Sequence, residues 1–148
     1  MKAQSTQEIR LRTGIISKET RKNAPSEIFN LTKHRSTWRE QKMGLVEPTW
    51  KVKRDIIGLL SFPVMPDQLI LEDKAHELAG IAKLSGCKKA LIGGAGFFMS
   101  TLEMALCYHG IEPVFTWMLK GEDNSWQFGG FVESILVEKG WLDYAKSD

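Results

Sequence analysis

A short apolar segment that leads directly into glycines and then into a helical pattern is the feature that most constrains the fold. It runs from Lys88 to Cys107 and reads KKALIGGAGFFMSTLEMALC. A buried strand, a glycine turn and a helix start in this order build a phosphate-accepting corner in many α/β proteins. Glycine lets the backbone approach a ligand, and Ser100 or Thr101 can cap the helix whose free amide groups point to the same place. The segment therefore predicts where a ligand binds, but it names no reaction.

Length and composition fit one globular domain. The chain has 148 residues, of which 43% are hydrophobic and 26% are charged, enough for a real core. Its apolar runs fall far short of the roughly 20 residues of a membrane helix, and no apolar stretch follows the basic N-terminal residues. We therefore expect a cytoplasmic protein with no membrane contact. Cys87 and Cys107 have neither zinc-site spacing nor the density of a disulfide scaffold, so we expect reduced core thiols.

Charge is distributed unevenly along the chain. Residues 1–54 hold 13 Lys and Arg against 5 Asp and Glu, a net charge of +8. Residues 55–148 hold 7 against 13, a net charge of −6. The first third therefore has the charge to meet an anion, with nucleic acid or a nucleotide as the leading classes. A basic tail that only aids solubility is the alternative.

The periodicities predict a flexible basic extension over residues 1–26 and a single α/β domain over 27–148. Strands are predicted over 27–32, 90–92, 114–119 and 126–132, the fourth with a bulge or a close backbone approach at its double glycine and the third central or covered on both faces. Helices are predicted over 50–60, 67–86, 100–108 and 134–145. Residues 35–49 are predicted as a connection with at most one helical turn.

These elements predict a small sheet of about four to five mostly parallel strands with flanking helices. Right-handed crossovers between parallel strands place Thr32 and Gly93 at the same carboxyl edge, where we expect the site. The glycine turn is not a dinucleotide fingerprint, because Met99 stands where the third glycine would be, and it is not a P-loop. An anion corner and a tight packing turn both stay open. In the first case Phe97, Phe98 and Met99 form a base-stacking wall, and in the second they are core residues.

Three side chains near this edge are candidates for catalysis. His34 follows the first strand beside Lys33 and can bind or protonate a phosphate oxygen, although an exposed loop histidine is the alternative. Ser100 can act as a nucleophile if a base lies within reach. With Thr101 and Glu103 it also resembles ordinary helix capping. The sequence assigns the catalytic role to none of them.

The other two histidines are interpreted as structural. His76 lies inside a predicted amphipathic helix, and His109 lies at a helix C-terminus, where the helix dipole favours its cation. The three histidines are far apart in the sequence and lack the spacing of a known metal motif. We therefore expect no metal and no cofactor, unless the fold brings these residues together.

Basic residues and tryptophans alternate between Lys33 and Arg54. They have the composition of an oligonucleotide-binding surface: Lys33, Arg35, Trp38, Arg39, Lys42, Trp50, Lys51, Lys53 and Arg54. The alternative is that both tryptophans are core anchors.

With these residues in place, the chain resembles small CRISPR-associated Rossmann-like (CARF) proteins. The resemblance spans about residues 27–133 and rests on IFNLTKH from Ile28, ALIGGA from Ala90, MSTLE from Met99 and GFVE from Gly130. It implies a Rossmann-like sheet, binding of cyclic oligoadenylate, and ring-nuclease activity in single-domain members. It also implies a homodimer with the ligand across the two-fold axis. The ligand-binding residues that it implies are Asn30, Thr32, His34, Gly93, Gly94, Ala95, Gly96, Ser100 and Thr101.

The leading interpretation is a nucleotide-binding α/β domain that senses or cleaves a cyclic oligonucleotide. A ring nuclease can work by aligning a ribose 2′-hydroxyl with its phosphate, so the absence of an obvious triad does not oppose it. The alternative is a non-enzymatic interaction protein that binds nucleic acid or a protein partner through its basic residues 1–54.

Overall fold

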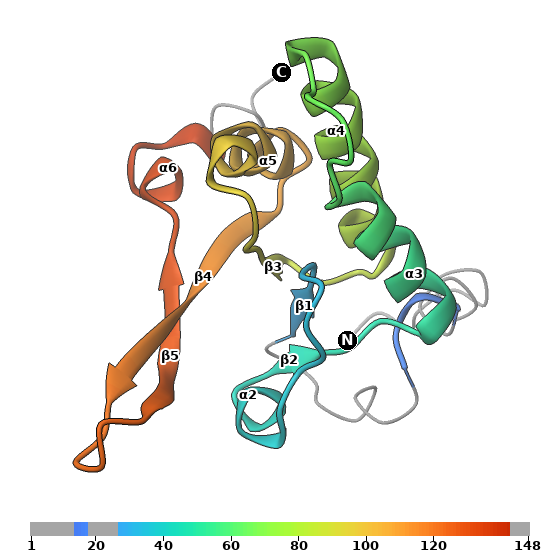
Figure 1. Ribbon diagram of the computed structural model, residues 1–148. Helices are drawn as coiled ribbons and strands as arrows, with labels where there is room; N and C mark the ends of the chain where they lie inside the picture. Colours follow the sequence, from blue (N-terminus) through green and yellow to red (C-terminus); the bar gives the residue numbers. More distant parts are fainter. Residues whose placement is uncertain (1–13, 18–26, 143–148) are drawn as a thin grey trace.

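The computed structural model describes residues 14–17 and 27–142. Within these ranges the chain forms a five-stranded sheet with flanking helices (Figure 1). The strands are β1 (Ile28–Asn30), β2 (Leu45–Val46), β3 (Lys89–Leu91), β4 (Glu112–Lys120) and β5 (Trp126–Glu133). The helices are α2 (Trp38–Lys42), α3 (Trp50–Leu59), α4 (Gln68–Leu84), α5 (Gly96–Tyr108) and α6 (Ile135–Glu138). The predicted α/β class is confirmed.

The sheet is mixed, with the strand order β2-β1-β3-β4-β5. β1 pairs in parallel with β2 and β3, and β3 pairs in parallel with β4, whereas β4 and β5 form an antiparallel hairpin. From β1 the chain passes to β2 on one side and then returns through α3 and α4 to β3 on the other side. The direction of winding therefore reverses between β1 and β3. Open α/β sheets form their ligand crevices at the carboxyl ends of the strands that flank such a point.

Alternating residues of the short strands face two different cores. Phe29 of β1 and Ala90 of β3 belong to the larger core, which also contains the buried faces of α3, α4 and α5. Leu91 and Val114 belong to a smaller cluster on the opposite face, against which Phe131 of β5 packs. This period of two is what a strand buried on both faces requires.

The two central helices begin and end close to where the sequence predicts. Asp67 is the N-cap of α4, and its side chain accepts a hydrogen bond of 2.8 Å from the backbone N–H of Ile70. α3 ends before Pro63, as expected. The predicted helix over 134–145 is shorter in the described residues, where α6 ends at Glu138, and residues 143–145 lie outside them.

Residues 35–49 contain more structure than predicted. Thr37 and Glu40 form a reciprocal capping box at the start of α2, and the chain then enters β2. β2 has two residues, too few for a periodic pattern to appear in the sequence, and it is defined by its pairing with β1 through Leu45 and Ile28.

Residues 14–17 do not behave as part of a flexible extension. Ile16 is fully buried and forms an antiparallel bridge with Pro48. The backbone N–H of Thr49 donates to the carbonyl of Ile15 at 2.7 Å, and the N–H of Ser17 donates to the carbonyl of Glu47 at 2.8 Å. Ile16 therefore belongs to the core, and the rest of the predicted extension, residues 1–13 and 18–26, lies outside the described residues.

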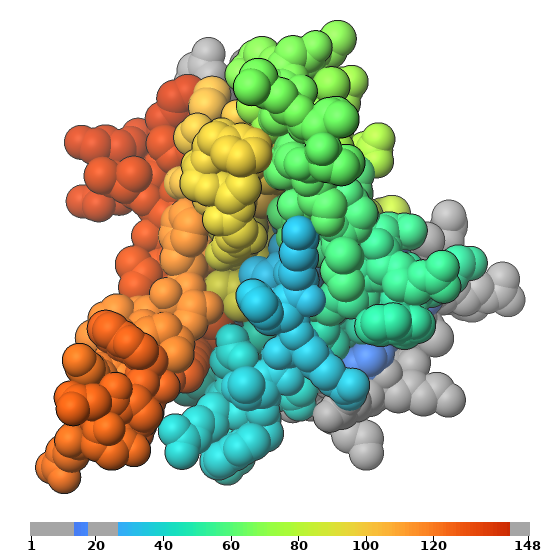
Figure 2. Space-filling view, in the orientation of Figure 1, coloured from blue at the N-terminus to red at the C-terminus, as the bar shows by residue number. Residues whose placement is uncertain are grey.

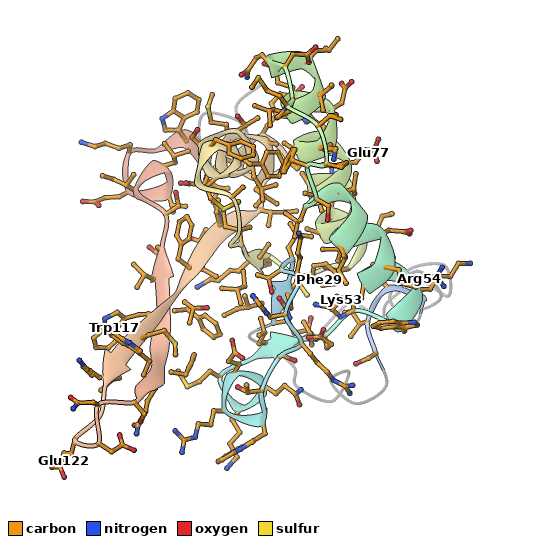
Figure 3. All side chains as sticks on the ribbon, in the orientation of Figure 1. Phe29, Lys53, Arg54, Glu77, Trp117 and Glu122 are labelled. Atoms are coloured by element: carbon orange, nitrogen blue, oxygen red, sulfur yellow. The ribbon has the colours of Figure 1, made fainter. Side chains whose placement is uncertain are left out.

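β4 and β5 continue beyond the sheet as a ribbon that stands off the body (Figure 2). The prediction that β4 is covered on both faces is wrong for its outer half, where Trp117 is 55% exposed. The predicted bulge is confirmed, because the register shifts between Trp117 and Met118. A Cβ on Gly129 would lie 2.5 Å from Leu119 Cδ2 and 2.8 Å from Trp117 Cε3, so a larger residue would force these side chains to shift. Figure 3 shows Trp117 and the tip residue Glu122 along this ribbon.

Candidate functional site

The turn from Gly93 to Gly96 forms an open backbone corner between β3 and α5. Gly94 has a φ of +136°, which residues with a side chain rarely adopt. Gly94 and Gly96 are exposed, and a Cβ on Gly96 would meet nothing within 4 Å. We call residues 93–96 the glycine corner. It is open to solvent, as an anion site requires.

The glycine corner contains the start of α5, so the predicted start at Ser100 is wrong by about one turn. The N-cap of α5 is Ala95, which makes no side-chain capping hydrogen bond. Ser100 and Thr101 lie in the second turn and do not cap the helix. The amides of Gly96 and Phe97 open the first turn, where N–H groups have no acceptor within a helix, whereas the N–H of Phe98 donates to the Ala95 carbonyl at 3.0 Å. The first-turn amides carry the positive end of the helix dipole, which attracts anions.

The end of β1 lies beside the glycine corner, as predicted. A Cβ on Gly93 would lie 3.9 Å from Thr32 Cγ2. Asn30 and Thr32 are nevertheless buried, with exposed fractions of 1% and 9%. The Thr32 hydroxyl donates to Asn30 Oδ1 at 2.6 Å, and Asn30 Nδ2 donates to Glu47 Oε2 at 2.8 Å. The polar groups of both residues are therefore engaged inside the protein.

A buried ion pair between Glu47 and Lys53 holds the loop after β1 in place. Lys53 Nζ lies 2.9 Å from Glu47 Oε1 and donates to the backbone carbonyls of Thr32 and His34, each at 2.9 Å. The Lys53 side chain is 5% exposed and that of Glu47 is 7% exposed. Lys53 was predicted to lie on a basic surface, so its burial is a correction. The sequence offered one signal for the pair: Glu47 follows the apolar residues Leu45 and Val46, whereas Lys53 lies between Lys51 and Arg54 and gives no such signal.

The environment of Glu47 keeps it ionised. Burial alone would raise the pKa of Glu47, but hydrogen bonds from Lys53, Asn30 and the Ser36 backbone, with the charge of Lys53, hold the pKa below its ordinary value. Hydrogen bonds to a carboxylate are stronger than those between neutral groups. The ion pair of Glu47 and Lys53 therefore anchors the loop that carries Lys33 and the exposed His34.

A hollow of about 310 Å³ lies next to this ion pair. Its lining residues are Ser17, Lys33, Arg35, Glu47, Pro48, Trp50, Lys53 and Ile57. We call it the basic hollow. Trp50 is 71% exposed and Trp38, on α2, is 61% exposed, so the alternative that both are core anchors is wrong. Exposed aromatic rings among cations are the combination that stacks bases and attracts phosphates.

A second hollow, of about 510 Å³, is lined in part by Phe97, the residue that follows the glycine corner. Its lining residues are Phe62, Pro63, Val64, Met65, Pro66, Leu71 and Phe97. We call it the apolar hollow. Phe97 is 57% exposed and meets Phe62 edge to face, with ring centroids 5.0 Å apart, whereas Phe98 is fully buried. Phe97 is therefore exposed, as the base-stacking alternative requires, whereas Phe98 is a core residue, as the packing alternative requires.

The catalytic candidates do not form a catalytic group with one another. Ser100 is exposed on α5, and among the described residues no hydrogen bond joins it to a histidine. His76 and His109 contact each other and lie away from the glycine corner, toward the other end of α5. The pKa of His109 is lowered by burial and by the charges of His76 and Lys83.

Within residues 14–17 and 27–142, no three His, Cys, Asp or Glu side chains gather closely enough to enclose a metal ion. In the same part of the chain, no helix has both the length and the apolar character needed to cross a membrane. Comparisons with protein-family models, curated proteins and solved structures give no match for this chain. What the site binds must therefore be inferred from its own geometry and charge.

Proposed function

We propose that the chain is a nucleotide-binding domain with a Rossmann-like sheet, which holds phosphate at the glycine corner and a base in the apolar hollow. One observation carries the proposal: Phe97 contributes to both places. Its N–H lies in the first turn of α5, and its ring lines the hollow. A ligand with an anionic group next to a flat, weakly polar group can contact both at once.

Within nucleotides, we favour cyclic oligoadenylate, the ligand that the CARF resemblance implies. It carries several phosphates and several bases, and the exposed Lys33 and His34 supply further positive or polar groups near the carboxyl edge. The ligand would lie across the two-fold axis of a homodimer and contact two glycine corners. Asn30 and Thr32 act in this proposal as positioning residues, because their polar groups bond within the loop after β1.

Ring cleavage is a further part of this proposal. The ribose 2′-oxygen attacks the adjacent phosphorus while the bond from phosphorus to the 5′-oxygen breaks, and the 2′-hydroxyl proton ends on that 5′-oxygen. The products are a 2′,3′-cyclic phosphate and a free 5′-hydroxyl. Alignment by the glycine corner and charge from Lys33 favour this step, and His34 can relay the proton. Ser100 is one turn further along α5, and no hydrogen bond joins it to a base within the described part of the chain, so it is the weaker candidate.

Calorimetric titration with cyclic tetra- and hexa-adenylate, ATP and AMP tests the proposal. Phe97→Ala should weaken binding about tenfold or more because a stacked base loses its platform. Tyr108→Ala is its matched control, an exposed aromatic at the other end of the same helix. Lys33→Glu should weaken binding and reduce the salt dependence of the affinity. Lys88→Glu, before the amino end of β3, should change neither. Absence of heat with all four ligands, or equal effects in the controls, overturns the proposal.

A second candidate function is the binding of single-stranded nucleic acid along α2 and the basic hollow. Trp38 is exposed with Lys42 Nζ 4.6 Å from its ring centre, and it lines a hollow of about 400 Å³ with Trp126 of the ribbon. Fluorescence anisotropy with oligonucleotides at several salt concentrations measures this function. Truncation should remove residues 1–13 and spare 14–17, because loss of Ile16 would open the core. Salt-dependent binding that is lost in Trp38→Ala, without any nucleotide binding, favours this function.

A further inference from the structure

The fold brings together two histidines that are 33 positions apart in the sequence. His76 lies in the middle of α4, and His109 is the C-cap of α5. Nδ1 of His76 lies 3.3 Å from Nε2 of His109, and the ring centroids are 5.5 Å apart. His76 is exposed and His109 half-buried, so both rings are accessible.

The separation of the two nitrogens matches that of two ligands on one metal ion. Imidazole nitrogens lie about 2.0–2.1 Å from a tetrahedral zinc ion, which places two of them about 3.3–3.4 Å from each other. The observed separation is longer than the roughly 2.9–3.0 Å of a typical hydrogen bond from an N–H group. From this geometry we propose that His76 and His109 together bind a divalent transition-metal ion, with zinc as the reference case.

Some groups around the two histidines favour a bound cation, and one opposes it. His109 ends α5, where the unpaired carbonyls of the last turn form the negative end of the helix dipole. The Tyr108 ring lies beside both imidazoles, and Lys83 of α4 contributes a like charge. No third His, Cys, Asp or Glu joins the pair in the described part of the chain. In the proposal, His76 and His109 are the two ligands from the described residues and water takes the remaining positions.

This site is separate from the glycine corner. α5 has 13 residues, so its two ends are about 20 Å apart. Imidazole ligands suit zinc, copper and nickel, whereas magnesium and calcium prefer oxygen. A bound ion would link α4 to α5 and thereby stabilise the packing of α5, the helix that begins at the glycine corner.

Metal titration of the full chain, purified without a histidine tag, tests the proposal. Calorimetry with zinc chloride should give one site, and zinc at tenfold excess over its dissociation constant should raise the melting temperature by about 3–6 °C. His76→Gln, His109→Gln and the double variant should each abolish the high-affinity site and the melting shift to the same extent. His34→Gln replaces the remaining histidine and should preserve both. Magnesium should have no effect.

Circular dichroism of the variants without metal verifies that their folding is intact, since both side chains reach the surface. Cobalt substitution adds a spectroscopic readout, because nitrogen ligation alters the visible absorption of the ion. Zinc binding that persists in the double variant overturns the proposal, as does binding that His34→Gln removes. Equal retention of binding in both single variants also overturns it, because a shared ion needs both nitrogens.

Discussion

The carboxyl ends of β1 and β3 lie side by side at the reversal point of the sheet, yet they are built in opposite ways. After β1, the side chains of Asn30, Thr32, Glu47 and Lys53 form a buried network with one another and with the backbone. After β3, the glycine corner presents bare backbone to solvent. One end is closed by its own polar groups, and the other is left open.

In the proposed function, the closed end positions the loop after β1 and the open end binds the ligand. A buried ion pair loses much of its Coulomb energy to desolvation, so it contributes little net stability over an apolar pair, although removal of one partner is costly. Lys53 uses its remaining donors on the two carbonyls of the loop after β1. The network therefore fixes the shape of the loop after β1, and in the proposed function the neighbouring amides of α5 supply the contacts to an anion.

The largest expected effect tests the closed end. Lys53→Met leaves the Glu47 carboxylate buried without its cation and removes the donor to the Thr32 and His34 carbonyls. We expect a loss of about 3–5 kcal/mol in the free energy of unfolding, measured by urea denaturation. Lys51→Met, at an exposed position of the same helix, should change this free energy by less than about 0.5 kcal/mol.

A double variant separates the pair from the site around it. Glu47→Leu combined with Lys53→Met removes both charges, and it should recover part of the loss because no charge stays buried and unpaired. If Lys53→Met alone is as stable as the wild type, the closed end does not hold the loop in the way described.

The next effect tests the open end. Gly94→Ala forces a residue with a side chain to a φ of +136°, at a cost of about 1–3 kcal/mol in unfolding free energy. The added Cβ itself finds space, with Met99 Cε at 3.9 Å, so strain in the backbone is the cause. Gly58→Ala is the control: it lies inside α3 with nothing within 4 Å of its Cβ and should gain about 0.5–1 kcal/mol. Equal effects of both changes would show that the backbone of the glycine corner is not constrained.

A third effect is a loss of stability at acidic pH. It concerns only the closed end, where Glu47 is buried. The pKa of Glu47 is lower in the folded chain than its ordinary value of 4.5, so the unfolded chain binds a proton first as the pH falls. The stability from Glu47 is therefore complete above about pH 5, and it is lost as the pH falls through 4.5 and then through the lower folded value. Urea denaturation of wild type and Glu47→Gln across pH 3–7 should give a shallower acid slope for the variant. Parallel slopes would contradict this assignment.

The sequence predicted the open end better than the closed one, for a physical reason. Glycines after an apolar strand constrain the local backbone, so the corner and its place beside Thr32 were visible from Gly93 onward. The closed end depends on contacts between residues far apart in sequence, such as Asn30 with Glu47, and no local pattern records them. For the same reason the sequence did not predict β2, which is defined by its pairing with β1, or the contact between His76 and His109.

The start of α5 was misplaced because helix propensity and tertiary packing disagree there. Glycine is a poor helix former, which favoured a start at Ser100. The cost is small in the first turn, however, and burial of Phe98 and Leu102 in the main core extends the helix back to Gly96. The outer half of β4 was misjudged for a related reason: its apolar run, typical of a buried strand, forms the exposed face of a ribbon.

The smallest expected effect is the change in the free energy of unfolding on replacement of Ser100. Its sign shows whether the Ser100 hydroxyl caps α5 or leaves the first-turn amides uncapped. If Ser100 capped the helix, Ser100→Ala would cost about 1 kcal/mol of unfolding free energy. In the structure Ser100 is an exposed residue of the second turn, so the change to alanine should instead gain a few tenths of a kcal/mol, about 0.3–0.5. Asp67→Ala is the matched control, because Asp67 does cap α4 through Ile70 and should cost about 1 kcal/mol. A loss at Ser100 as large as that at Asp67 would mean that a hydroxyl already occupies the first-turn amides, and the glycine corner would then have no free donors for an anion.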